Sequence, residues 1–159
     1  MVRIASEEIV KLAKNMGFGD VVAQIIETKD GQVKIACGRI ENVLDREYRV
    51  LSLFLEKDKR IISTTLENPL KDRIEKILTQ AKNSIENLSP NEDYNGIADL
   101  SFRDEDGLNE TEFDLIPKAQ EALDQTGNFK CAGVINGFIE NRKLSTSNGV
   151  FYTDVNEFY

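Results

Sequence analysis

The strand-like runs of this chain are joined by connections too short to let neighbouring strands lie parallel. A parallel crossover needs roughly a dozen or more residues, usually including a helix. Apart from the stretch that holds two helical patterns, every connection here is shorter, so neighbouring strands are predicted to be antiparallel. The runs are residues 21–27, 32–37, 48–55, 60–66, 130–139, 143–147 and 150–155.

Residues that favour tight turns separate these runs. Lys29-Asp30-Gly31 and Asn148-Gly149 contain dipeptides typical of hairpins, because glycine adopts positive φ without strain. Glu56–Lys59 and Glu140–Arg142 predict two further turns. The run at 48–55 is apolar on both faces, which predicts a central position in the sheet.

Three helical patterns accompany the strands. Ser6 is predicted to cap the first helix and Gly17 to end it. Asn68-Pro69 is predicted to open the second, and the third should run from Asp114 to Thr126, with Pro117 in its first turn and Gly127 as its stop. Inward positions are predicted at Ile9, Leu12, Ala13 and Met16; at Leu70, Ile74, Ile77, Leu78, Ala81, Ile85 and Leu88; and at Ile116, Ala119 and Leu123.

The predicted order of elements is αββββααβββ. This order indicates an α+β fold with a mainly antiparallel sheet in two meanders and helices packed on one face. A chain of 159 residues is the size of one domain, so a single α+β domain over 1–159 is expected. Residues 91–111 contain many acidic side chains and few periodic apolar ones, which predicts a long exposed connection.

The chain contains no histidine, the side chain most used for proton transfer and metal binding near neutral pH. Cys37 and Cys131 lie far apart in strand-like runs and are predicted to be buried, reduced thiols. The acidic stretch Arg103-Asp104-Glu105-Asp106-Gly107 lacks the spacing of an EF-hand, so a solvated loop is favoured over a weak cation site. No catalytic residue, metal ligand or cofactor-binding residue is therefore predicted.

The charge balance argues against a nucleic-acid partner. The chain has 20 basic and 28 acidic residues, a net charge of -8, which repels a phosphate backbone. The densest basic stretch, Lys57-Asp58-Lys59-Arg60, is interpreted as a solvated hairpin tip. No apolar run approaches the roughly 18 residues that a membrane helix needs, so a soluble cytoplasmic protein without membrane contact is expected.

Two features of the last strands leave alternatives open. Gly133 and Gly137 indicate either close backbone packing, which is favoured, or a peptide lying along the strand. The chain ends on Phe158-Tyr159 without a polar tail, which predicts a terminal strand edge that contacts a second copy, a partner subunit or a peptide. The alternative is that this segment packs within its own sheet.

Several short motifs resemble one known family. They are Gly19-Asp20-Val21-Val22-Ala23, Gly38-Arg39-Ile40-Glu41, Ile62-Ser63-Thr64-Thr65, Ala81, Asp93-Tyr94-Asn95-Gly96-Ile97 and Ser145-Thr146-Ser147-Asn148-Gly149. With the order of elements, they resemble the N-terminal domain of the TldD/PmbA family, known as modulators of DNA gyrase and as metalloproteases with their partner subunits. Lys57 and Arg60 depart from the family, which tends to place glycines around this hairpin, and typical members are considerably longer.

The resemblance implies a role without catalysis. The family's zinc site, a His-Glu-x-x-x-His helix with a later cysteine, belongs to a portion beyond this chain, so no catalytic residue is carried over. We therefore expect a non-catalytic N-terminal domain, or a truncated member, of a peptidase assembly that positions unfolded peptide or contacts a partner subunit. As purified, the chain is expected to lack peptidase activity and stoichiometric zinc.

A second hypothesis is a self-sufficient binding protein that resembles this domain and regulates another protein through an exposed sheet edge. The reading frame beyond the codon for Tyr159 distinguishes the two hypotheses. An open frame encoding the His-Glu-x-x-x-His pattern supports the first, and a natural stop codon favours the second.

Overall fold

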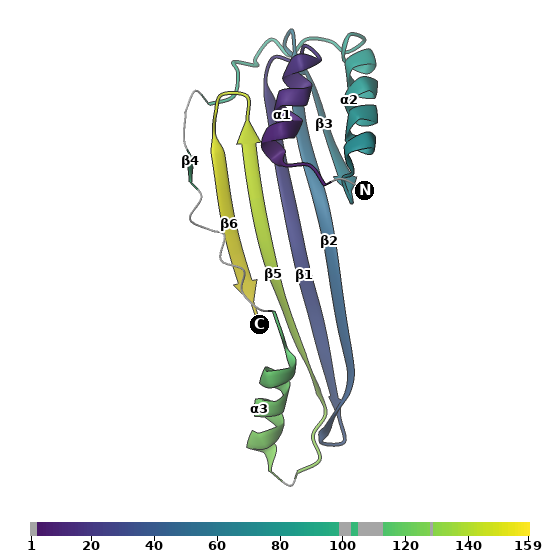
Figure 1. The fold of residues 1–159 in the computed structure, drawn as a ribbon, viewed down its shortest axis with the longest axis vertical. Helices are drawn as coiled ribbons and strands as arrows, with labels where there is room; N and C mark the ends of the chain where they lie inside the picture. Colours follow the sequence, from purple (N-terminus) through teal and green to yellow (C-terminus); the bar gives the residue numbers. More distant parts are fainter. Residues whose placement is uncertain (1–2, 99–102, 105–112, 128) are drawn as a thin grey trace. The chain divides into compact units, whose positions relative to one another are not determined.

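A computed structural model describes residues 3–98, 103–104, 113–127 and 129–159 (Figure 1). Its elements are α1 (Ser6–Asn15), β1 (Val21–Ala36), β2 (Arg39–Lys57), β3 (Arg60–Glu67), α2 (Lys71–Ile85), β4 (Arg103–Asp104), α3 (Ile116–Thr126), β5 (Gly133–Thr146) and β6 (Phe151–Phe158). The described strands form a six-stranded sheet in the order β3-β2-β1-β5-β6-β4. The predicted α+β class with a mainly antiparallel sheet is confirmed.

Two predicted turns are absent, because β1 continues through Lys29-Asp30-Gly31 and β5 continues through Glu140–Arg142. Gly31 lies inside β1, where close packing against other side chains, and not a turn, accounts for the glycine. A Cβ atom there would lie 3.0 Å from Asp45 Oδ1 and 3.0 Å from Phe113 Cε1. The number of long strands is therefore lower than the sequence predicts.

The observed hairpin turns lie where two consecutive residues have positive φ. Cys37 (52°) and Gly38 (74°) join β1 to β2, and Asp58 (51°) and Lys59 (62°) join β2 to β3. Two residues of positive φ match the right-handed twist of the flanking strands. The predicted turn at Asn148-Gly149 is confirmed, with φ of 87° at Gly149.

The chain divides into two compact units. Unit 1 comprises Met1–Ile26, Arg49–Leu108 and Arg142–Asp154, and unit 2 comprises Glu27–Tyr48, Asn109–Asn141 and Val155–Tyr159. Each unit has its own apolar cluster among the described residues. The expectation of a single domain over 1–159 stays a prediction.

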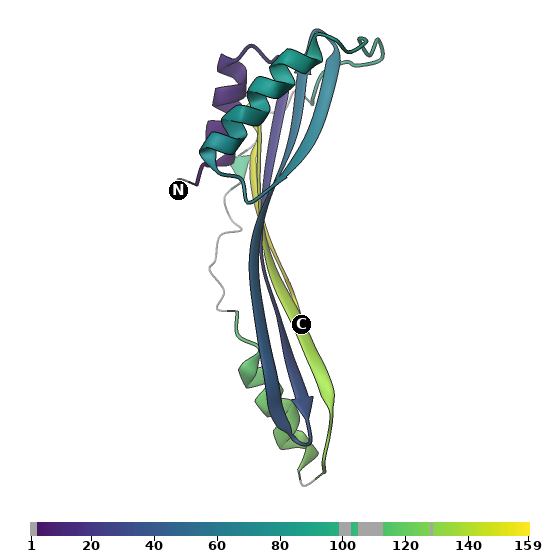
Figure 2. The same ribbon diagram turned by 90° about the vertical axis from the view of Figure 1, so that its right-hand side faces the viewer.

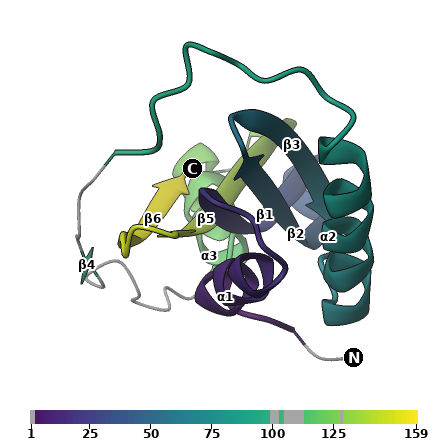
Figure 3. The same cartoon turned by 90° about the horizontal axis from the view of Figure 1, so that it is seen from above.

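In unit 1, α1 and α2 cover one face of β1, β2 and β3 (Figures 2 and 3). Alternate strand residues such as Leu51, Leu53 and Leu55 are buried beneath the helices, as expected for one covered face. The helical stripe predicted for α2 is confirmed at Ile74, Leu78, Ala81 and Ile85, all buried. The unit 1 core also contains Ile4, Ile9, Val10, Ala13, Phe18, Val21, Ala23, Ile25 and Leu66.

Both predicted helix caps in unit 1 are wrong. Ser6 is the first residue of α1, and its buried hydroxyl lies 2.8 Å from the hydroxyl of Ser145. Asn68 has φ of 49° and precedes α2, whose N-cap is Leu70. The side chain of Ser6 thus makes a long-range polar contact, although local capping rules predict that it caps the helix.

In unit 2, α3 packs on the second half of β1. Leu115 and Ala119 form a buried cluster with Val33 and Ile35. Pro117 lies in the first turn of α3, as predicted. Ile116, predicted to point inward, is 45% exposed.

The C-terminal strand lies within the sheet. β4 pairs in parallel with β6, opposing Arg103 to Phe151 and Asp104 to Tyr152. The prediction of a terminal strand without a neighbour is therefore wrong at these positions. Arg103 and Asp104, predicted to lie in the exposed connection, belong to a strand, and Glu105-Asp106-Gly107 lie outside the described residues.

Candidate functional site

The face of the unit 1 sheet opposite α1 and α2 carries a shallow groove of about 410 Å³. Because strand side chains alternate, Ser52 and Phe54 lie on this face while their neighbours in β2 enter the core. The groove is lined by Val22, Gln24, Ser52, Leu53, Phe54, Ser63, Thr64, Thr65 and Leu144.

None of the described residues that line this groove carries a charge, although the chain has a net charge of -8. The lining combines the hydroxyl groups of Ser52, Ser63 and Thr65 with the apolar side chains of Phe54 and Leu144. Hydroxyls both donate and accept hydrogen bonds, so this lining suits a neutral ligand that carries amide groups and apolar side chains.

Tyr94 links the groove to the start of β1. Its ring lies against Phe54, with 6.0 Å between the ring centroids. Its hydroxyl donates a hydrogen bond of 2.7 Å to Asp20 Oδ2, which also accepts the backbone N–H of Ile97 at 3.2 Å. Burial and this bond to the carboxylate raise the pKa of Tyr94.

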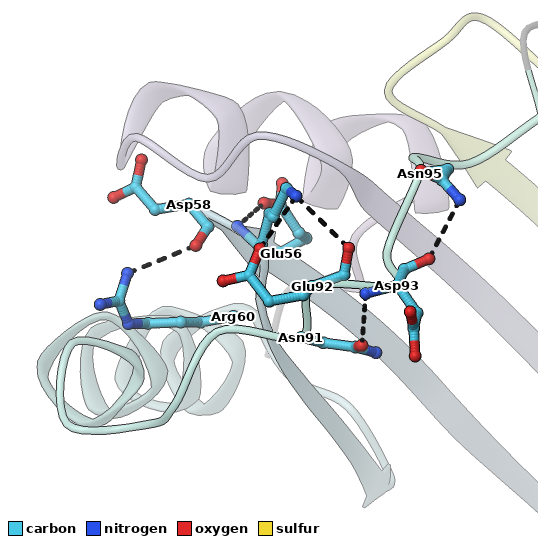
Figure 4. A network of polar contacts seen from close by, with 8 residues as sticks. Glu56, Asp58, Arg60, Asn91, Glu92, Asp93 and Asn95 are labelled. Carbon is cyan, nitrogen blue, oxygen red and sulfur yellow. Dashed lines mark hydrogen bonds and ion pairs between the residues drawn. The ribbon is translucent and has the colours of Figure 1, made fainter.

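Glu56, shown beside the β2–β3 turn in Figure 4, connects this turn to the segment before β1. Its carboxylate accepts the backbone N–H groups of Asp20 at 3.1 Å and of Lys59 at 2.6 Å. A Cβ atom at Gly19 would collide with Glu56 Oε2. A side chain at the glycine of the Gly19-Asp20 motif would therefore displace the Glu56 carboxylate from its present position.

The loop after β5 joins the same region. Ser147 exchanges two hydrogen bonds with Val21, through its backbone N–H at 2.8 Å and its hydroxyl at 3.0 Å. The amide of Asn148 donates to the carbonyl oxygens of Ile97 and Ala98 at 3.4 and 3.2 Å. Three of the sequence motifs, around Asp20, Tyr94 and Ser147, thus meet at one end of the unit 1 sheet.

The basic stretch Lys57-Asp58-Lys59-Arg60 forms the hairpin tip that the sequence predicts. Lys57 pairs with Glu86 at 2.7 Å, and this hydrogen bond raises the pKa of Lys57 and lowers the pKa of Glu86. Lys59 pairs with Glu92 at 3.3 Å, and Arg60 donates to the carbonyl oxygen of Asp58 (Figure 4). Arg60 also donates to the carbonyl oxygen of Leu88. Lys57, Lys59 and Arg60 therefore bind acidic side chains and carbonyl oxygens of this same chain.

Within the described residues, no group of three or more acidic, cysteine or histidine side chains is arranged to hold a metal ion. The acidic loop, the one metal candidate in the sequence, lies largely outside those residues. Helices in the described part of the chain all lack the length and apolar character needed to cross a membrane.

Close packing in unit 2 accounts for Gly137, one of the two glycines that the sequence places in this strand. A Cβ atom at Gly137 would lie 2.9 Å from Leu115 Cδ2 and 3.0 Å from the carbonyl oxygen of Phe158. Among the described residues, none beyond the two chain neighbours of Gly133 has an atom within 4 Å of the corresponding position there. The close-packing interpretation therefore holds for Gly137.

No protein-family model and no curated protein sequence matches this chain. The fold is nevertheless that of a known class of domain. TldE from Thermococcus kodakarensis matches with a TM-score of 0.71 at 15% identity, over 97% of this chain and 37% of that protein. Two proposed modulators of DNA gyrase also match. The protein from Thermotoga maritima has a TM-score of 0.59 at 10% identity, over 95% of this chain and 36% of its own. The protein from Bacteroides thetaiotaomicron has a TM-score of 0.60 at 13% identity, over 96% of this chain and 38% of its own.

The predicted resemblance to the TldD/PmbA family is thus confirmed for the fold. The chain spans a little over a third of the length of each of these proteins. The groove itself was not predicted. Its one signal is the strand at 48–55, whose second apolar face includes Phe54.

Proposed function

We propose that this chain is a non-catalytic interaction domain of a TldD/PmbA-type peptidase assembly, acting in the cytoplasm. Its role is to position an extended segment of unfolded peptide, or to contact a partner subunit, through the open face of the unit 1 sheet. The observation that carries the proposal is the uncharged groove on that face. The similarity of fold to TldE supports the type of assembly.

The chemistry of the groove favours polypeptide as the occupant. An extended peptide presents backbone amides that hydroxyls such as Ser63 and Thr65 can bind, while alternate side chains reach apolar surface beside Phe54. A nucleic acid would meet no cation among the lining residues that the structure describes. The absence of histidine from the sequence supports a role without peptide hydrolysis by this chain alone.

A binding titration with matched variants tests the proposal. The probe is a fluorescein-labelled peptide of zero net charge that alternates apolar and hydroxyl side chains, followed by fluorescence anisotropy. Ser63→Arg fills the groove from the exposed strand β3, whereas Ser84→Arg adds the same charge on the exposed face of α2. We expect Ser63→Arg to weaken binding at least about tenfold, or 1.4 kcal/mol, and Ser84→Arg to leave it unchanged. Equal affinity for the two variants contradicts the proposal.

A second candidate function rests on the first half of β2. Pairing with β3 starts at Val50, so within the described residues β3 does not extend along 39–48. Val43, Leu44 and Tyr48 in this segment are 38%, 42% and 45% exposed. A strand edge that β3 leaves uncovered, with apolar side chains beside it, suits the alternative, a self-sufficient regulatory module that binds another protein by adding a strand.

The two candidates respond to different substitutions. A double variant, Val43→Lys with Leu44→Lys, places two charges on the β2 edge and leaves the groove intact. Loss of binding in this variant, with normal binding by Ser63→Arg, establishes edge pairing as the mode of interaction.

A further inference from the structure

Cys37 and Cys131, which are distant in sequence, meet in unit 2. The backbone N–H of Gly38 donates a hydrogen bond of 3.0 Å to the carbonyl oxygen of Cys131. A Cβ atom at Gly38 would lie 3.7 Å from the carbonyl oxygen of Phe129, so the segment before β5 runs along the β1–β2 turn. Both cysteines are free.

This hydrogen bond brings the two backbones close to bridging distance. The Cα atoms of Cys37 and Cys131 are each two covalent bonds from the bonded atoms, so they lie within roughly 8 Å of each other. Disulfides span Cα separations of about 4.4 to 6.8 Å. If the two Cα atoms are separated by the full distance of roughly 8 Å, a small movement of the turn brings them into the range that a disulfide spans.

The two thiols differ in their surroundings. Cys131 packs against the cluster that includes Val33 and Ile35, and its Sγ lies 3.8 Å from the hydroxyl of Thr126, whereas Cys37 lies in the β1–β2 turn with φ of 52°. Cys37 is exposed, contrary to the prediction of a buried thiol, and Cys131 is half-buried. An oxidant therefore reaches Cys37 first.

We propose that Cys37 and Cys131 form a reversible intrachain disulfide when the chain meets a small-molecule disulfide such as oxidised glutathione. The Cys37 thiolate attacks one sulfur, forming a mixed disulfide and releasing one reduced glutathione. The Cys131 thiolate then attacks Cys37 Sγ and releases a second reduced glutathione. Both cysteine thiols are oxidised, one disulfide of glutathione is reduced, and the two thiol protons end on the glutathione leaving groups.

The bridge ties the β1–β2 turn to the segment that enters β5. In a reducing compartment such a disulfide is transient and follows the redox state of its surroundings. It constitutes an oxidation-sensitive modification site in unit 2.

Intact-mass spectrometry of the 159-residue chain tests the proposal, after incubation with excess oxidised glutathione and quenching with iodoacetamide. We expect a product lighter by two hydrogen atoms, without alkyl groups, and a doubly alkylated chain after reduction by dithiothreitol. Cys131→Ser should instead accumulate one glutathione adduct at Cys37. Cys37→Ser should react more slowly, because its remaining thiol is half-buried. Circular dichroism confirms that both variants are folded.

Two outcomes overturn the inference. One is a wild-type chain that retains a glutathione adduct at Cys37 as persistently as Cys131→Ser does. The other is a disulfide-linked dimer of two chains through Cys37, detected by non-reducing electrophoresis at low protein concentration.

Discussion

The hydroxyl of Tyr94 donates a hydrogen bond of 2.7 Å to Asp20 Oδ2 and so attaches the loop after α2 to the start of β1. Tyr94→Phe removes this bond and keeps the ring against Phe54. Because the acceptor is a carboxylate, we expect a loss of about 1.5 to 3 kcal/mol in unfolding free energy. Urea denaturation measures it, with Tyr48→Phe at an exposed tyrosine as the control.

The same pair predicts a dependence on alkaline pH. Burial and the bond to Asp20 raise the pKa of Tyr94 above its ordinary value of 10.0. The folded chain therefore holds this proton more tightly than the unfolded chain, and stability falls as pH rises above 10. The difference between wild type and Tyr94→Phe should shrink between about pH 8 and about pH 11. A difference that stays constant over this interval shows that the phenol does not titrate with unfolding.

Glu56 is expected to be the most sensitive acidic residue of unit 1. Glu56→Ala leaves the backbone N–H groups of Asp20 and Lys59 without their carboxylate acceptor. We expect a loss of about 2 to 4 kcal/mol, against less than about 0.5 kcal/mol for Glu75→Ala on the exposed face of α2. Similar melting temperatures for the two variants would rule out a structural role for the Glu56 carboxylate.

Three neighbouring positions on α2 should respond in a graded way to aspartate. Leu78 is fully buried, Ile77 is half-buried and Lys76 is exposed. Leu78→Asp should unfold unit 1, because an unpaired buried carboxylate costs several kcal/mol against a total stability of roughly 5 to 15 kcal/mol. Ile77→Asp should lower the melting temperature less, and Lys76→Asp should change it little. Any other order in thermal denaturation contradicts the packing of α2.

The two glycines of β5 form a matched pair for unit 2. Gly137→Ala adds a methyl group 2.9 Å from Leu115 Cδ2 and should cost about 1 to 3 kcal/mol. Gly133→Ala adds the same group where, in the described part of the chain, no atom beyond the neighbouring residues lies within 4 Å, and it should be neutral or slightly stabilising. Equal losses in the two variants would show that strand propensity, and not packing against Leu115, decides the effect.

Features set by nearby residues could be predicted from the sequence. The helical period gives the buried stripe of α2, and a glycine with positive φ gives the turn at Asn148-Gly149. The hairpin predicted at Asp30-Gly31 is wrong because Gly31 accommodates Phe113, a residue far away in the chain. Local turn propensity carries no information on such a contact.

The candidate site was even less accessible to prediction. The motifs around Asp20, Tyr94 and Ser147 could be recognised separately, but their meeting depends on long-range hydrogen bonds. Ser63, in the edge strand β3, reads in the sequence as an ordinary exposed strand residue. It becomes part of a site only because the sheet places it in the same groove as Phe54.

The central claim is that the open face of the unit 1 sheet binds polypeptide. Two-dimensional amide NMR of the chain, titrated with the uncharged peptide described above, tests it most directly. We expect the largest chemical-shift changes at Val22, Ser52, Phe54 and Ser63, and no comparable changes in α1 or α2. Changes confined to residues 39–48, or none at peptide concentrations that saturate the anisotropy signal, would contradict this account.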